Sequence, residues 1–285
     1  MAAAGWTGDS SAEHVDIIVP SRGWARPRWD EVWRYRELLY FLTWRDVKVR
    51  YKQTVLGVAW AVLQPLAAML IFAVFFGRLA GLDQHTGGTP YPLYVYAGLL
   101  PWTLFATAVT NSSGSVVASA RLVTKVYFPR LVIPLSAVGA ALVDFACATV
   151  VLVGLMIYYR APVSLALLVA PLFVIGIAAL ATGVGAIFAA LTVQYRDFRY
   201  VIPFGIQLWM YITPVIYPPD LVPVRWRWIL FLNPAAGLIE GFRGALLGRP
   251  IDPRLTALSL AISVLLVLAG TAYFRRAERQ FADVI

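Results

Sequence analysis

The sequence WRDVKVRYKQTVLGVAWAVLQPL, from Trp44 to Leu66, changes from a basic segment into a long apolar run. Four bases lie in its first half: Arg45, Lys48, Arg50 and Lys52. From Val55 onward, only Gln64 and Pro65 interrupt the apolar run. Basic residues beside an apolar span hold that end of the span on the cytoplasmic face of a membrane. The stretch therefore predicts the place where the chain enters a membrane from the cytoplasm.

The composition of the whole chain is that of an integral membrane protein. Hydrophobic side chains make up 60% of the 285 residues and charged ones only 14%, which is more apolar than a soluble domain requires. The net charge is +9, but Lys and Arg lie at the ends of apolar runs and form no continuous stripe. We therefore attribute the charge to membrane orientation and expect no nucleic-acid partner.

Side chains that form disulfides or bind metals are scarce. Cys147 is the only cysteine, so one chain cannot form a disulfide, and His14 and His85 lie in polar, loop-like surroundings. We expect no metal site. Residues 1–28 begin without the basic start and apolar core of a signal peptide, so we expect no cleavage and interpret them as a disordered cytoplasmic tail.

Residues 29–54 are predicted to form a cytoplasmic interfacial region. Between Asp30 and Leu42, apolar side chains recur with helical spacing, which predicts an amphipathic helix too short and too charged to cross a membrane. The alternative is an ordinary soluble helix packed against a partner. Thr43 and Asp46 have the spacing of a capping box, which predicts that a new helix starts there and changes direction before the first span.

The apolar runs that follow predict an all-α integral membrane domain over residues 55–285. Six spans are expected, at about 55–76, 92–109, 131–159, 163–191, 201–216 and 255–274. Pro65 is expected to kink the first span. The small polar residues from Asn111 to Ala120 are expected to pack closely against another helix. Two shorter apolar pieces before the last span are interpreted as outer re-entrant or interfacial helices.

The positions of the bases predict the orientation. With six spans, 17 of the 24 Lys and Arg residues fall on the inner side and 7 on the outer side. Counting residues 217–254 as a further span would move the bases of the C-terminal tail outside. Because bases are enriched in cytoplasmic segments, the sequence favours six spans with both termini in the cytoplasm.

The sequence excludes ATP binding by a phosphate loop. The only lysines are Lys48, Lys52 and Lys125, and none belongs to a GxxxxGK[ST] motif. Any work driven by ATP therefore needs a separate subunit, and we assign no catalytic residue to this chain.

Three ionisable residues in apolar segments are candidates for function. Asp144 is the only acid in the middle of a predicted span, so it either faces a base or a wet cavity, or makes a structural hydrogen bond to a neighbouring helix. Glu240 and Arg243 are three residues apart, so they can pair on a short helix or contact a substrate. The sequence leaves both alternatives open.

Three motifs resemble those of the ABC-2 type permeases that export polysaccharides such as O-antigen, capsule, teichoic acid and galactan. RDVKVRYKQTVLGVAWAVLQPL (45–66) resembles the start of the first span in that family. KVYFPRLVIP (125–134) resembles its cytoplasmic loop between the second and third spans, and NPAAGLIEGFRGALLG (233–248) its outer re-entrant segment. The motifs occur in the family's order and on the sides that the charge count predicts.

The resemblance implies a transport subunit that is not an enzyme. Two copies would form a homodimer in the bacterial cytoplasmic (inner) membrane, and two copies of a nucleotide-binding ATPase subunit, which would bind ATP and Mg, would dock beneath it. The substrate would be a glycan linked to undecaprenyl diphosphate. The rival functions are an ABC-2 exporter of a drug or small lipid, and a membrane-embedded enzyme that acts on lipid-linked sugars.

The resemblance also implies roles for particular residues. The cytoplasmic gate and ATPase-coupling segment would contain Arg121, Lys125, Tyr127, Phe128, Pro129 and Arg130. Basic side chains suited to a lipid pyrophosphate are Arg45, Lys48, Arg50 and Lys52. The aromatic candidates for lining a pore are Trp60, Phe72, Phe75, Phe76, Phe204, Trp209 and Tyr211. The outer gate would contain Asn233, Pro234, Glu240 and Arg243.

Overall fold

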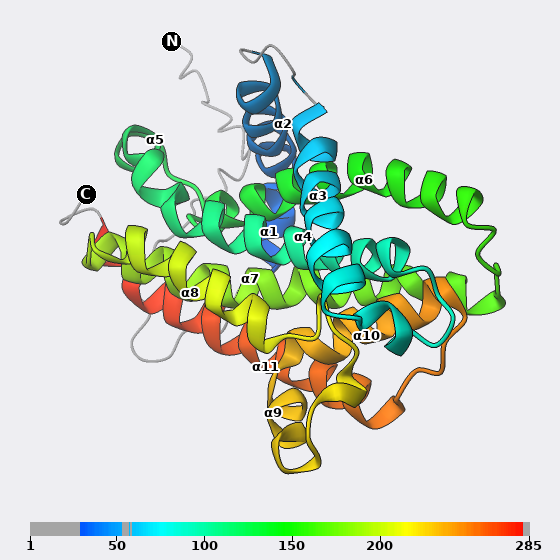
Figure 1. Cartoon of the computed structure of the whole chain (residues 1–285). Coiled ribbons are helices and arrows are strands. Elements are labelled where there is room, and N and C mark those ends of the chain that lie inside the picture. The colour runs from blue at the N-terminus through cyan, green and yellow to red at the C-terminus, as the bar shows by residue number, and fades with distance from the viewer. Residues whose placement is uncertain (1–28, 53–56, 58, 282–285) are drawn as a thin grey trace, which may run out of the picture.

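The computed structural model describes residues 29–52, 57 and 59–281, which form helices and connecting turns without a β-strand (Figure 1). Within these residues, five helical segments are long and apolar enough to cross a membrane: Ala59–Leu79, Tyr91–Ala118, Val132–Tyr158, Leu165–Gln194 and Pro253–Glu278. The prediction of an all-α protein with several apolar helices of membrane-spanning length is confirmed. The predicted N-terminal tail and the first residues of the first predicted span lie outside the described residues.

Two helices precede the first long apolar segment. The short helix α1 (Trp29–Arg34) is followed by α2 (Arg36–Lys52), which passes through Thr43 without a break. The prediction that a new helix starts at Thr43 is therefore wrong. The two residues do not form a capping box because both make tertiary contacts. Thr43 packs against Gly139, and the Asp46 carboxylate accepts hydrogen bonds from Arg45 and, at 3.2 Å, from the Ser136 hydroxyl.

Helix α3 (Ala59–Phe72) contains Pro65 and continues into the π-helical segment η1 (Ala73–Leu79). In Figure 1, α3 runs steeply across the other long helices. Only 11% of its most apolar window is buried within the chain, against 78% for the corresponding window of α4. Helix α3 is therefore the long apolar segment with the least packing inside one copy of the chain.

The central helix is α4 (Tyr91–Ala118), which packs against α3, α6, α7, α8 and α10. It is nine residues longer at its C-terminal end than predicted, because Ser113 and Ser115 donate hydrogen bonds to carbonyls of their own helix and so remain satisfied inside it. Ser112 packs against Gly185 of α7 and donates a 2.9 Å hydrogen bond to the Pro134 carbonyl of α6. The predicted close packing of these small residues is confirmed.

Three further long helices match predicted spans closely. They are α6 (Val132–Tyr158), α7 (Ala170–Gln194), preceded by the 3-10 turn η3 (Leu165–Val169), and α11 (Pro253–Glu278). Helices α7 and α11 touch at two glycines, since a Cβ atom at Gly270 would overlap the Gly183 carbonyl group. This contact lets the two backbones approach closely.

The predicted fifth span differs from the others. Helix α8 (Phe198–Ile212) has 15 residues, or about 22 Å, which is shorter than the roughly 30 Å hydrocarbon core of a bilayer. It is followed by the short helices α9 (Arg227–Leu232) and α10 (Pro234–Leu247), as expected for the two shorter apolar pieces. Among the described residues, five helical segments therefore have spanning length, where six spans were predicted.

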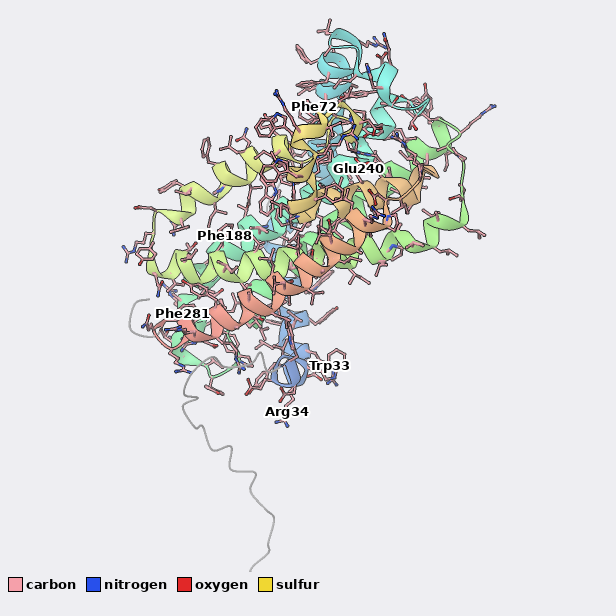
Figure 2. All side chains as sticks on the ribbon, turned by 90° about the horizontal axis from the view of Figure 1, so that it is seen from below. Trp33, Arg34, Phe72, Phe188, Glu240 and Phe281 are labelled. Carbon is pink, nitrogen blue, oxygen red and sulfur yellow. The ribbon has the colours of Figure 1, made fainter. Side chains whose placement is uncertain are left out.

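The two ends of the described chain lie together. Arg275 of α11 makes a 2.8 Å ion pair with Glu31 of α1, and Gln194 at the end of α7 donates a hydrogen bond to Gln280. In Figure 2, Trp33, Arg34 and Phe281 lie on the lower side, whereas Phe72 and Glu240 lie on the upper side. A separate hydrophobic cluster, which includes Phe128 and Phe281, holds this end together.

Candidate functional site

The predicted coupling segment contains both exposed and anchored side chains. It is formed by helix α5 (Ala120–Lys125) and the turn that leads into α6. Arg121, Lys125 and Tyr127 are exposed, with 72% of Tyr127 accessible, and Pro129 is half-buried. Phe128 is buried in the hydrophobic cluster at the chain ends. The segment therefore exposes charged and aromatic side chains, while the buried Phe128 ring anchors it to the bundle.

Arg130 provides a polar anchor for this segment. Its backbone N–H donates a 3.0 Å hydrogen bond to the Glu278 carboxylate, and its guanidinium donates a 2.7 Å bond to the Glu278 carbonyl oxygen. These two bonds join residues 148 positions apart in the sequence. Arg130 thus fixes the predicted coupling segment to the C-terminal end of α11.

The four bases of the opening stretch have different surroundings. Arg45 pairs with Asp46 at 2.8 Å, and Arg50 forms an ion pair with Asp144. The Lys48 ammonium lies 5.6 Å from the centre of the Trp44 ring, and Lys52 is exposed. Two arginine charges are therefore already neutralised by carboxylates, which leaves Lys48 and Lys52 better suited to an external anion.

Asp144 has two partners that the sequence did not predict. It accepts hydrogen bonds from the Arg50 guanidinium and from the Tyr51 hydroxyl, both at the end of α2. These groups line a cavity of about 290 Å³, which Trp60, Gln64 and Thr107 also border. The two alternatives left open by the sequence are thus both realised, because Asp144 faces the base Arg50 and also hydrogen-bonds to a neighbouring helix.

At the opposite end of the bundle, Arg243 of α10 is fully buried. It donates hydrogen bonds to the Tyr94 carbonyl at 3.2 Å, to the Tyr94 hydroxyl at 2.8 Å and to the Val215 carbonyl at 2.6 Å. It also pairs with Glu240, as the spacing allowed, and binds the Pro214 carbonyl at 3.2 Å. Arg243 therefore ties α10 to α4 and to the turn after α8, which is a structural role.

Asn233 joins the start of α10 to the end of α8. Its side-chain oxygen accepts hydrogen bonds from the Trp209 indole at 3.0 Å and from the Ala235 backbone at 3.1 Å, which caps α10. Its amide nitrogen donates a 2.9 Å bond to the Thr213 hydroxyl. Asn233 is buried, as are Pro234 and Arg243, so the predicted outer-gate residues form a packed cluster in which only Glu240 is partly exposed.

The aromatic candidates for a pore fall into two groups. Four are at least half exposed in the single chain: Trp60, Phe75, Phe204 and Tyr211. The other three pack inside the chain: Phe72 and Phe76 form an edge-to-face pair with centroids 5.7 Å apart, and the Trp209 ring lies 5.0 Å from that of Phe105. Helices α3 and α8 thus each carry exposed aromatic rings and also partly buried rings that pack the helix against the rest of the bundle.

These features define a polytopic α-helical membrane protein with a basic, aromatic surface at one end and a packed polar cluster at the other. The family model for the ABC-2 type transporter matches residues 37–247. The chain therefore belongs to the ABC-2 type transporter family.

Several relatives have names that describe export. The chain is 32% identical to the O-antigen export system permease protein RfbA of Klebsiella pneumoniae over 87% of its own length and 95% of that protein. It is 28% identical to the protein of the same name in Myxococcus xanthus, over 90% and 98% of the two chains. The polysialic acid transport protein KpsM of Escherichia coli is 25% identical over 82% and 91%.

Proposed function

We propose that this chain is the permease subunit of an ABC exporter that carries a polysaccharide linked to undecaprenyl diphosphate across the bacterial cytoplasmic membrane. The observation that carries the proposal is the match to O-antigen export permeases, at 32% identity over nearly the full length of both chains. The sequence has no phosphate loop, so ATP and Mg bind to a separate nucleotide-binding subunit.

The working unit is a homodimer that binds two copies of the ATPase subunit. Helices α3 and α8 form the interface and the pore, and their uncovered apolar faces in the single chain support this arrangement. Trp60, Phe75, Phe204 and Tyr211 line the path, where aromatic rings stack on the apolar faces of sugars. Arg121, Lys125 and Tyr127 contact the ATPase, and Lys48 and Lys52 meet the lipid pyrophosphate.

Helix α8 acts as the sixth crossing, and both termini are cytoplasmic. The C-terminal ends of α7 and α11 are joined through Gln194 and Gln280, so both helices finish on the same side. Since α11 starts at the other end of the bundle, this arrangement supports a crossing between Gln194 and Asp252. The buried residues from Thr213 to Ile216 lengthen the short α8 and make this crossing possible.

The function is tested by deleting the gene from its native strain and measuring surface polysaccharide with and without the restored chain. We expect lipid-linked polymer to accumulate inside the deletion strain and to reach the surface again after complementation. Co-expression with a nucleotide-binding ATPase subunit from the same strain, followed by pull-down, should retain that partner. Normal surface polysaccharide in the deletion strain would exclude the proposal and favour a drug or small-lipid exporter.

A further inference from the structure

An apolar groove of about 760 Å³ opens between α6 and α7. In Figure 1, the connection between these two helices lies on the side of the bundle away from the C-terminus. Phe145, Val153 and Ile157 of α6 form one wall, and Val174 of α7 forms the other. Phe242 and Leu246 of α10 form its buried floor. A cavity of this size is in the range of ligand sites, and in a membrane protein an outward-facing apolar groove is open to lipid chains.

The length of the groove corresponds to one leaflet. Its lining on α6 extends from Phe145 to Ile157, and the twelve helical rises between these residues span roughly 18 Å at 1.5 Å per residue. Half of the hydrocarbon core of a bilayer is roughly 15 Å. The groove therefore suits a single acyl chain that enters from the nearer membrane surface.

A basic residue lies at the mouth of the groove. Arg160 is exposed and lines the groove just beyond the end of α6. Its side chain belongs to no ion pair among the described residues. Tyr158 and Tyr159 precede it and pack edge to face, with Tyr158 78% exposed. Tyrosines beside a base are typical of the headgroup layer, which places Arg160 at the depth of lipid phosphates.

The backbone conformation at Arg160 is unfavourable for an arginine. The residue has φ of 52°, and it is the only residue other than glycine in the left-handed region among those described. The Ala161 N–H donates to the Met156 carbonyl and the Arg160 N–H to the Ile157 carbonyl, which is the hydrogen-bond pattern of a Schellman motif. Glycine is the favoured residue at this position, so arginine is held there against its own conformational preference.

We infer that this groove binds an anionic phospholipid, with one acyl chain between α6 and α7 and its phosphate against Arg160. An undecaprenyl chain is much longer than one leaflet is deep, whereas the acyl chain of a phospholipid matches the length of the groove. The opposite charges of the phosphate and Arg160 select anionic over zwitterionic lipid. The site is separate from the proposed pore at α3 and α8, and it does not depend on the identity of the exported substrate.

Native mass spectrometry of the delipidated full-length chain, titrated with phosphatidylglycerol or phosphatidylcholine, tests the site. We expect one phosphatidylglycerol to be retained per chain, in preference to phosphatidylcholine. Val153→Trp narrows the groove and should sharply weaken retention of both lipids. Val150→Trp is the matched control, because Val150 is exposed on the same helix but does not line the groove.

Arg160→Gly removes the positive charge without disturbing the fold, since glycine suits the left-handed turn. It should weaken retention of phosphatidylglycerol about fivefold and leave phosphatidylcholine unchanged, whereas Arg160→Lys should keep the preference. Equal retention of the two lipids by the unmodified chain would overturn the inference. So would equal lipid retention by Val153→Trp and Val150→Trp, or an unchanged preference in Arg160→Gly.

Discussion

Arg50, two residues before the end of α2, pairs with Asp144 near the middle of α6, 94 positions later in the sequence. Removing one partner of a partly buried ion pair leaves the other charge without compensation, whereas replacing both by apolar groups can be nearly neutral. We expect Asp144→Leu to lower the free energy of unfolding by about 2 kcal/mol, discounted for the part-exposure of Arg50. Thermal unfolding in detergent of Asp144→Leu, Arg50→Met and the double variant measures this. If the losses of unfolding free energy in the two single variants add up to the loss in the double variant, the two residues are not coupled.

Arg130 should matter for transport more than for membrane insertion. Arg130→Glu removes the hydrogen bond to the Glu278 carbonyl oxygen and brings a second carboxylate toward Glu278. The loss of one charge-assisted hydrogen bond is of the order of 1.5 kcal/mol, so we expect ATP-dependent export to fall roughly tenfold. Insertion, followed by the amount of chain in the membrane fraction, should be unchanged. Export at the normal rate would remove this contact from the coupling mechanism.

The stability of the chain should depend on pH through the Glu240 carboxyl group. Burial raises the pKa of this carboxyl group, and the neighbouring Arg243 guanidinium opposes the shift only in part. A group whose pKa is higher in the folded than in the unfolded state binds its proton more tightly when folded. Its stabilising contribution is therefore complete at low pH and is lost as the pH rises from about 4.3, the unfolded value, through the folded pKa. The free energy of unfolding of Glu240→Gln should fall less steeply than that of the unmodified chain over this range. Equal slopes would contradict the prediction.

Asn233 offers a graded test of the cluster at the start of α10. Asn233→Ala removes a helix cap and the hydrogen bonds to Trp209 and Thr213, and should destabilise the chain by about 2–3 kcal/mol. Asn233→Asp keeps an oxygen that accepts from Trp209 and Ala235 but loses the donor to Thr213, so its cost should be intermediate. Thermal unfolding in detergent measures both variants. If the aspartate variant were as unstable as the alanine variant, the cap would not be the main contribution.

The proposed dimer can be tested by cross-linking. In a Cys147→Ser background, Phe75→Cys on η1 or Tyr211→Cys on α8 should form a disulfide-linked dimer on mild oxidation, because both positions are exposed on the proposed interface helices. Tyr158→Cys is the control, since it is exposed on α6 next to the proposed lipid groove. The readout is the dimer band on a non-reducing gel of whole membranes. Dimer formation by Tyr158→Cys alone would place the interface elsewhere.

Local sequence predicted the long helices well where packing agrees with hydropathy. The predicted span 131–159 and the observed α6 (Val132–Tyr158) differ by one residue at each end, because the apolar run is bounded by bases and a proline. The predictions failed where tertiary contacts decide. Thr43 has the spacing of a helix cap but packs on Gly139, and the serines after Val109 have the polarity expected beyond a span but are satisfied within α4.

Individual site residues were less predictable. Arg50 was identified as a base near the membrane surface, but its pairing with Asp144 depends on the path of α2 along α6, which no local pattern records. The spacing of Glu240 and Arg243 allowed their pairing as one of two alternatives, yet gave no sign of the bonds from Arg243 to Tyr94 and Val215. Contacts within one helical turn can be inferred from spacing, whereas contacts between helices require the fold.

The joined chain ends have a mechanical consequence. Because Arg130 is bonded to Glu278 and Glu31 is paired with Arg275, a push applied to α1 or to the segment before α6 reaches α11 directly. The contact between Gly270 and Gly183 then transmits the displacement to α7. These elements are tied together by polar bonds and close packing, whereas α3 is the long apolar segment with the least burial in the described chain. If the proposed ATPase docks at this end, we expect its movement to shift the bonded elements together and to tilt α3.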